Sequence, residues 1–325
     1  MRREIGGVER WARELSNRLP LLRPERYSVI RPPSTLAHAA GQAWEQLALP
    51  LAARGSELLL SPANVAPLAG RRNVVVIHDL APFHDPDWFG GLYGTWHRAL
   101  IPRIARRARL VFAPSEYVRD ELVELLGVDP AKVQAVAPGV DPAFAEPPAP
   151  EPLLRRLGLQ QPYVLALATD SPRKNLGLID RIAPKLAEAG LGLAIAGSGR
   201  PYLPGSAPGS ARRLGYVPDP DLPALYAGAA AFAMPSVYEG FGLPCLEAMA
   251  AGTPVVAADR AALPEACGGA ALLADPDDDD AFAAALIRAA GAESERLTEA
   301  GRTRAAGLSW ARSAESVDAA IGALL

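Results

Sequence analysis

Two glutamates, Glu239 and Glu247, bracket a glycine-rich stretch in the second half of the chain, Gly240-Phe241-Gly242-Leu243. An apolar run over 229–234 predicts a buried strand before it, and Pro244 suits the first turn of a helix after it. Glycine lets the backbone approach a ligand closely, and free N–H groups at a helix N-terminus attract phosphate. Carboxylates only accept hydrogen bonds, which suits the paired hydroxyls of a sugar or a ribose. The spacing therefore predicts a sugar-nucleotide site, although glycines in a turn and a glutamate beside a helix dipole are the structural alternative.

Adjacent cations, Arg173 and Lys174, follow an apolar run over 163–168 and precede a helix expected to reach about residue 189. The forked guanidinium and the compact ammonium together suit a diphosphate. A plain pair of surface cations is the alternative.

His78 and Asp79 follow the β-branched run 74–77. Ligands of parallel α/β sheets bind at the carboxyl ends of strands, which makes His78 a candidate site residue. A buried structural histidine is the alternative, and we expect Asp79 to orient the loop.

Composition excludes several classes of protein. The chain has 325 residues, half of them hydrophobic, a formal charge of −3 and two cysteines. This length favours two domains, and the charge gives no basic field for nucleic acid. Cys245 and Cys267 have no metal-ligand spacing, so we expect a reduced, cytoplasmic chain without a signal peptide or a membrane-spanning run.

Strands and helices alternate along most of the chain. We expect strands over 26–31, 57–61, 74–77, 110–115, 132–137, 163–168, 191–196, 214–217, 229–234 and 254–258. Helices are expected over 8–19, 35–53, 91–109 and 117–126, and near the C-terminus from Trp310. The proline-rich segment 147–150 is typical of a linker, so the first domain should end near residue 145. This pattern predicts two Rossmann-like α/β domains.

Two charged segments have simple structural interpretations. The acidic run 275–280 lies at an expected helix start, where the helix dipole favours carboxylates, so we do not expect a metal there. The helix near 96–109 is rich in arginine and could lie on an anionic membrane surface, although a solvated face is equally consistent.

The stretch from Glu239 to Glu247 resembles the signature of the retaining GT-B glycosyltransferases of glycosyltransferase family 4, and the resemblance covers most of the chain. It implies two domains facing across a cleft, 1–145 on the acceptor side and 146–308 binding the nucleotide sugar. The last helix, within 309–325, would cross back to complete the first domain.

The resemblance also implies roles for individual residues. Arg173, Lys174 and the N–H groups around Gly242 and Leu243 would hold the donor diphosphate. Glu247 would bind the ribose and Glu239 a hydroxyl of the donor sugar. Gly6, Gly7 and His78 would complete the donor site from the first domain. Gly240 and Phe241 would lie in the loop that holds the donor phosphates, and Gly197 would lie at the edge of the pocket for the nucleotide base. No metal or other cofactor is implied.

Two departures from the family pattern stand out. Ala168 and Ser171 occupy positions where the family often has glycine and glutamate. Only five residues precede Gly6, and they do not have the pattern of a strand, although the first strand of such a sheet is normally central. We expect that the start codon has been assigned too late, so that the first strand is missing from this sequence. The alternative is a first domain that lacks this strand.

The predicted activity is transfer of a hexose, with retention, from a nucleoside diphosphate sugar to a hydroxyl of a glycan or lipid-linked acceptor. The sequence does not identify the donor, which could be a UDP, GDP, TDP or ADP sugar. The run 44–78 resembles mannosyl- and rhamnosyl-type members of the family, which favours GDP-mannose. We expect action in the cytoplasm, with peripheral membrane contact through the helix near 96–109. The alternatives are a catalytically impaired relative and a non-transferring enzyme such as an epimerase. A nicotinamide enzyme is disfavoured, because no third glycine follows Gly197 and Gly199 at the required spacing.

Overall fold

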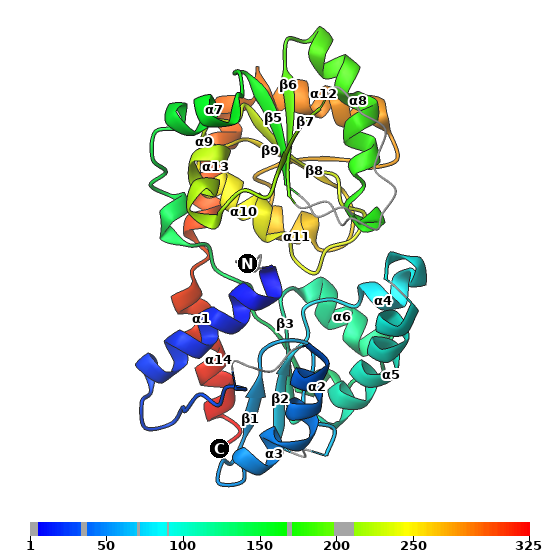
Figure 1. Ribbon diagram of the computed structural model, residues 1–325, viewed down its shortest axis with the longest axis vertical. Coiled ribbons are helices and arrows are strands. Elements are labelled where there is room, and N and C mark those ends of the chain that lie inside the picture. The colour runs from blue at the N-terminus through cyan, green and yellow to red at the C-terminus, as the bar shows by residue number, and fades with distance from the viewer. Residues whose placement is uncertain (1–5, 34–37, 70–71, 90, 168–170, 198–210) are drawn as a thin grey trace. The chain divides into compact units, whose positions relative to one another are not determined.

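The chain divides into two compact units (Figure 1). The computed structural model describes residues 6–33, 38–69, 72–89, 91–167, 171–197 and 211–325. Unit 1 comprises residues 1–139 with 310–325, and unit 2 comprises residues 140–309.

Unit 1 contains a parallel sheet of strand order β1-β2-β3-β4 among its described residues. The strands are β1 (Leu59–Ser61), β2 (Asn73–Val76), β3 (Leu110–Ala113) and β4 (Val133–Ala135). The helices are α1 (Gly7–Leu22), α2 (His38–Leu47), α3 (Leu49–Ala52), α4 (Ala81–His84), α5 (Gly91–Arg107), α6 (Glu116–Glu124) and α14 (Trp310–Gly322). β2 and β3 are buried along their whole length, and α5 and α6 pack their apolar faces on them.

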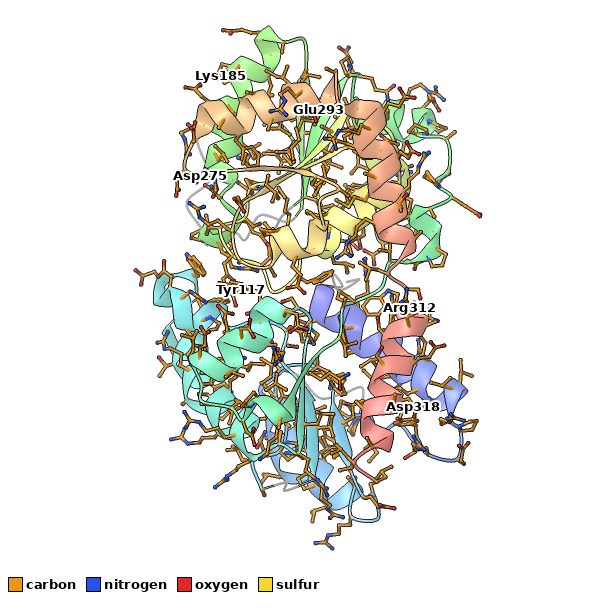
Figure 2. All side chains as sticks on the ribbon, turned by 180° about the vertical axis from the view of Figure 1, so that it is seen from behind. Tyr117, Lys185, Asp275, Glu293, Arg312 and Asp318 are labelled. Carbon is orange, nitrogen blue, oxygen red and sulfur yellow. The ribbon has the colours of Figure 1, made fainter. Side chains whose placement is uncertain are left out.

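The last helix belongs to unit 1, as Figure 1 shows for α14 beside α1. Trp310 packs edge-to-face on Trp11 of α1 at 5.8 Å. Asp318, labelled in Figure 2, accepts hydrogen bonds from Arg26 Nη1 at 2.9 Å and from the Tyr27 hydroxyl at 2.8 Å. These contacts anchor the segment after α1 to α14.

Unit 2 contains a parallel sheet of order β10-β9-β8-β5-β6-β7. The strands are β5 (Tyr163–Leu167), β6 (Gly192–Ala196), β7 (Arg212–Gly215), β8 (Ala231–Met234), β9 (Val255–Ala258) and β10 (Leu272–Ala274). The helices are α7 (Glu151–Leu157), α8 (Leu176–Glu188), α9 (Leu222–Ala227), α10 (Leu243–Ala250), α11 (Leu263–Cys267), α12 (Asp279–Ala290) and α13 (Ser294–Ala306). The central strands are buried on both faces, which explains their continuous apolar sequence.

One predicted strand is wrong. Residues 26–31 pair with no strand among the described residues, although Tyr27, Val29 and Ile30 give the segment strand-like composition. A strand needs a neighbour to supply its hydrogen bonds, and residues 27–32 line a cavity together with β1 instead of pairing with it. The helix predicted over 35–53 is divided into α2 and α3, and residues 34–37 lie outside the described chain.

Candidate active site

The candidate residues of unit 2 meet at the carboxyl ends of two neighbouring strands. Arg173 and Lys174 follow β5, whereas Glu239 to Leu243 follow β8, and the two strands pair in parallel. From β5 the chain continues to β6 and β7 on one side, and then returns to β8 on the other. This reversal of strand order is the position where open α/β sheets bind ligands.

Glu239 forms a buried ion-pair cluster with both cations. Its Oε1 lies 2.5 Å from Lys174 Nζ and its Oε2 lies 3.0 Å from Arg173 Nη1. Arg173 Nη1 also donates to the Tyr238 carbonyl at 2.7 Å, and the Val237 N–H donates to the Arg173 carbonyl at 2.9 Å. These bonds join the loop after β5 to the loop after β8 and hold both cations beside Glu239.

The cluster carries a net positive charge in a nearly dry environment. Glu239 is only 8% exposed. Burial alone would raise the pKa of Glu239, but the charges of Lys174 and Arg173 outweigh this effect and lower its pKa to about 2. One carboxylate against two cations leaves an excess charge of +1, which suits an anionic ligand such as a diphosphate.

The backbone between β8 and α10 forms a turn, and one position of this turn accepts only glycine. Gly242 is the N-cap of α10 and has φ +114°. A Cβ there would lie 2.7 Å from Leu263 Cδ2. Gly240 and Phe241 are buried in the same turn, and Leu243 begins the helix. Pro244 has no N–H and the Cys245 N–H donates to the Gly242 carbonyl at 2.9 Å, so within the described residues the N–H groups of Gly242 and Leu243 are the ones that this helix start offers to a phosphate.

Glu247 lies inside α10 and is 3% exposed. Its Oε2 accepts a hydrogen bond from the Tyr226 hydroxyl at 3.2 Å, and Thr253 Oγ1 donates to the Tyr226 carbonyl at 2.6 Å. Sequence reasoning missed Tyr226 as the residue that orients this carboxylate. No local spacing could have identified it, because Tyr226 reaches Glu247 from α9 through the tertiary fold.

His78 follows the carboxyl end of β2 in unit 1 and is 7% exposed. Its Nε2 lies 2.8 Å from the Pro62 carbonyl. Because a carbonyl can only accept, Nε2 carries the proton and Nδ1 is left as an acceptor in the neutral ring. Burial lowers the pKa of His78, against the opposing effects of Pro62, Asp79 and Glu9.

A second residue missed from the sequence is Trp11, whose ring packs edge-to-face on the His78 ring at 5.7 Å. This contact also places the start of α1, and with it Gly6 and Gly7, at the same carboxyl edge of the sheet as His78. Gly6 is the N-cap of α1, and the Arg10 N–H donates to its carbonyl at 3.0 Å.

The role of Gly197 at the edge of a base pocket stays a prediction. Its N–H donates to the Gly215 carbonyl at 2.9 Å, at the end of β6. Residues 168–170 and 198–210, which include Ala168 and the rest of the glycine-rich turn, lie outside the described residues.

The acidic run lies at the start of α12 and is paired with protein cations. Asp278 caps α12 by accepting from the Ala281 N–H at 2.9 Å. Arg260 bonds Asp275 and Asp277, Arg181 bonds Asp279, and Lys185 bonds Asp280. Figure 2 shows Lys185 and Asp275 on the side of unit 2 that α8 and α12 cover. Within the described residues, no group of three or more His, Cys, Asp or Glu side chains is placed to hold a metal ion.

Comparisons with known proteins agree with this geometry. Residues 56–144 match the family described as "Glycosyltransferase Family 4" and residues 161–291 the family described as "Glycosyl transferases group 1". The O-antigen chain mannosyltransferase B of Escherichia coli is 34% identical over 255 residues, which are 74% of this chain and 67% of that protein.

A GDP-mannose-dependent alpha-(1-6)-phosphatidylinositol monomannoside mannosyltransferase of Mycolicibacterium smegmatis is 31% identical, over 80% of this chain and 74% of its own length. The crystal structure of Anabaena Alr3699/HepE in complex with UDP and glucose superposes with a TM-score of 0.73 at 17% identity, covering 98% of this chain and 97% of that one.

The fold and family predicted from the sequence are therefore confirmed. The chain belongs to glycosyltransferase family 4 and is a glycosyltransferase with the two parallel-sheet α/β domains of the GT-B fold.

Proposed function

We propose that this glycosyltransferase transfers a mannosyl group from GDP-mannose to a hydroxyl of a glycan or lipid-linked acceptor, with retention at the anomeric carbon. The observation that carries the proposal is the cluster of Arg173, Lys174 and Glu239 beside the N-terminus of α10. The mannosyl assignment is supported by the named activities of the Escherichia coli and Mycolicibacterium smegmatis relatives.

Charge stabilisation of the leaving diphosphate is the main task of such a site. The Arg173 guanidinium, the Lys174 ammonium and the N–H groups of Gly242 and Leu243 would be the donors to that charge. Glu247, held by Tyr226, would accept from the ribose hydroxyls, and Glu239 would accept from a hydroxyl of the donor sugar. Because these donors can neutralise the charge of the diphosphate, we expect the reaction to need no metal ion.

Glu239 is poorly suited to act as a nucleophile. Both of its oxygens already bond cations, and a carboxylate with a pKa near 2 is a weak base. A glycosyl-enzyme intermediate on Glu239 is therefore disfavoured, and we infer front-face substitution, in which the acceptor hydroxyl attacks from the side that the diphosphate leaves.

The test is product analysis with GDP-mannose, UDP-glucose and ADP-glucose as donors and octyl α-D-mannoside as the probe acceptor. GDP release and an α-linked product, identified from its one-bond anomeric C–H coupling, are expected with GDP-mannose. A β-linked product, or preference for another donor, would overturn the corresponding part of the proposal.

We also propose peripheral membrane contact through α5. The buried face of this helix includes His97, Ile101 and Ile104, whereas Trp96 and the arginines at 103, 106, 107 and 109 are exposed. No described helix is long and apolar enough to cross a bilayer. Flotation with vesicles containing anionic lipid, at low salt, should recover the protein; equal recovery with neutral vesicles would contradict a role for these arginines.

A further inference from the structure

The loop after β1, residues 62–64, is bonded to the end of β2, where His78 lies. The Asn64 N–H donates to the Val76 carbonyl at 2.9 Å. The His78 N–H donates to Asn64 Oδ1 at 2.7 Å, and His78 Nε2 lies 2.8 Å from the Pro62 carbonyl. Two of these three bonds therefore end on His78, one on its backbone and one on its ring.

Asn64 fills a position of the β-ladder with its side chain. In a parallel pair, a residue that donates its N–H to the neighbouring strand offers its carbonyl to the N–H two residues further along that strand. Asn64 instead has φ +61°, a left-handed conformation that asparagine tolerates, and its side-chain Oδ1 accepts from the His78 N–H. The carboxamide of Asn64 thus takes the place of the backbone carbonyl.

The Pro62 carbonyl decides which ring nitrogen of His78 carries the proton. A carbonyl only accepts, so Nε2 is protonated and Nδ1 has a lone pair in the neutral ring. The carboxylates that face the ring, Asp79 beside it and Glu9 of α1, favour the imidazolium, but burial outweighs them and lowers the pKa of His78. Trp11 packs edge-to-face on the ring at 5.7 Å. The ring is therefore held neutral, in one orientation.

Nδ1 of His78 is available to a ligand. Among the described residues, the buried side-chain polar atoms without a partner are Trp11 Nε1, Asp180 Oδ1 and Ser236 Oγ. Nδ1 of His78 is not one of them and no described residue bonds to it, so it belongs to the small exposed part of the residue. A lone pair needs a donor, which a sugar hydroxyl supplies and an ionised phosphate does not. The ring therefore suits a hydroxyl group.

We propose that Asn64 is a positioning residue for His78: its carboxamide holds the 62–64 loop, and with it the Pro62 carbonyl, so that Nδ1 accepts a hydrogen bond from a hydroxyl of the bound substrate. The identity of that substrate rests on the proposed function, whereas the state of the ring does not. Without the carboxamide, the buried His78 N–H loses its acceptor. The loop must then shift or admit water, which moves the Pro62 carbonyl away from the ring.

The test reads the protonation of the ring directly. The chain has four histidines, so long-range proton–nitrogen spectra of the nitrogen-15-labelled protein resolve each ring, and His78→Gln assigns the signals of His78. At pH 8 the wild type should show a protonated Nε2 and an unprotonated Nδ1. Asn64→Gly keeps the left-handed backbone and removes the acceptor, so both tautomers should be populated and the two nitrogen signals should move toward each other. Unchanged signals in Asn64→Gly, or a protonated Nδ1 in the wild type, would overturn the proposal.

A second variant keeps the test decisive if Asn64→Gly is unstable. Asn64→Asp retains an oxygen acceptor at the same place and tolerates the same backbone conformation. The ring signals of the wild type should therefore be kept in Asn64→Asp, measured at pH 8 so that the added negative charge does not protonate the ring. A mixture of tautomers in this variant would show that the acceptor does not control the ring.

Kinetics test whether the state of the ring matters for the reaction. With GDP-mannose and octyl α-D-mannoside, Asn64→Gly should lower kcat/KM about 10-fold, the loss of one hydrogen bond, and leave the Kd for GDP unchanged. In the His78→Gln background, Asn64→Gly should cause no further loss, whereas equal losses in both backgrounds would contradict positioning through His78. Absence of transfer from GDP-mannose in the wild type would contradict the proposed function instead, and the ring signals would still decide the role of Asn64.

Discussion

Glu239 is the residue on which the chemistry of the site depends, because it holds two cations at once. Glu239→Gln should reduce transfer about 100-fold, since the amide cannot replace the charge that fixes both cations or accept from the donor sugar in the same way. The affinity for a nucleoside diphosphate should stay equal or increase, because the cations lose a competing anion. Initial rates and calorimetric Kd values check both parts.

A matched control exists on the surface of the same unit. Glu293, labelled in Figure 2, also bonds two arginines, Arg288 and Arg296, but its side chain is 23% exposed, against 11% for Glu239. Glu293→Gln should leave both transfer and affinity unchanged. Parallel losses of affinity and rate in Glu239→Gln would show that this carboxylate acts only by maintaining the fold.

At the scale of elements, the turn into α10 depends on the absence of a side chain at Gly242. Gly242→Ala should destabilise the protein by roughly 2–4 kcal/mol, because backbone strain at φ +114° adds to a collision with Leu263. Gly190 has φ +75° with open space around it, so Gly190→Ala isolates the strain and should cost only about 1 kcal/mol. Urea unfolding of both variants measures the difference, and equal losses would show that the contact with Leu263 is unimportant.

α2 places Glu45 at the cavity of unit 1 that residues 27–32 and β1 also line, and burial raises the pKa of Glu45 from 4.5 to about 7. Between these values the folded chain binds more protons than the unfolded chain, so the stability of unit 1 should fall as pH rises from about 4.5 to 7. The Glu45 contribution should be roughly 1–3 kcal/mol.

Urea unfolding at pH 5 and pH 7.5 measures this effect. Glu45→Gln should flatten the pH dependence, whereas Glu124→Gln, at an exposed position of α6, should leave it unchanged. An unaltered pH profile in Glu45→Gln would contradict the raised pKa.

At the scale of the whole molecule, the sequence predicted the alternation of strands and helices and the strand–turn–helix around Glu239. Continuous apolar runs such as 163–167 and 231–234 identify strands buried on both faces, and Pro244 marks a helix start that the structure has. These signals are local, so one chain suffices to detect them.

Long-range contacts could not be predicted in the same way. Tyr226 on Glu247 and Trp11 on His78 join elements whose separation in sequence carries no pattern. The error at 26–31 has a related cause: the composition of a strand is local, but its pairing depends on a neighbour, and no described strand pairs with this segment.

Unit 2 is expected to bind a nucleoside diphosphate through Lys174 and Arg173, beside the turn Gly240–Leu243. The most direct measurement is calorimetric titration of GDP and UDP into the wild-type protein, Lys174→Ala and Lys185→Ala, the last being a lysine of α8 that bonds Asp280 on the surface. We predict that Lys174→Ala weakens binding about 10- to 100-fold, the loss of one charge-assisted contact, and that Lys185→Ala binds as the wild type does. Absence of binding to either nucleotide, or equal affinities in the two lysine variants, would contradict the assignment of the site.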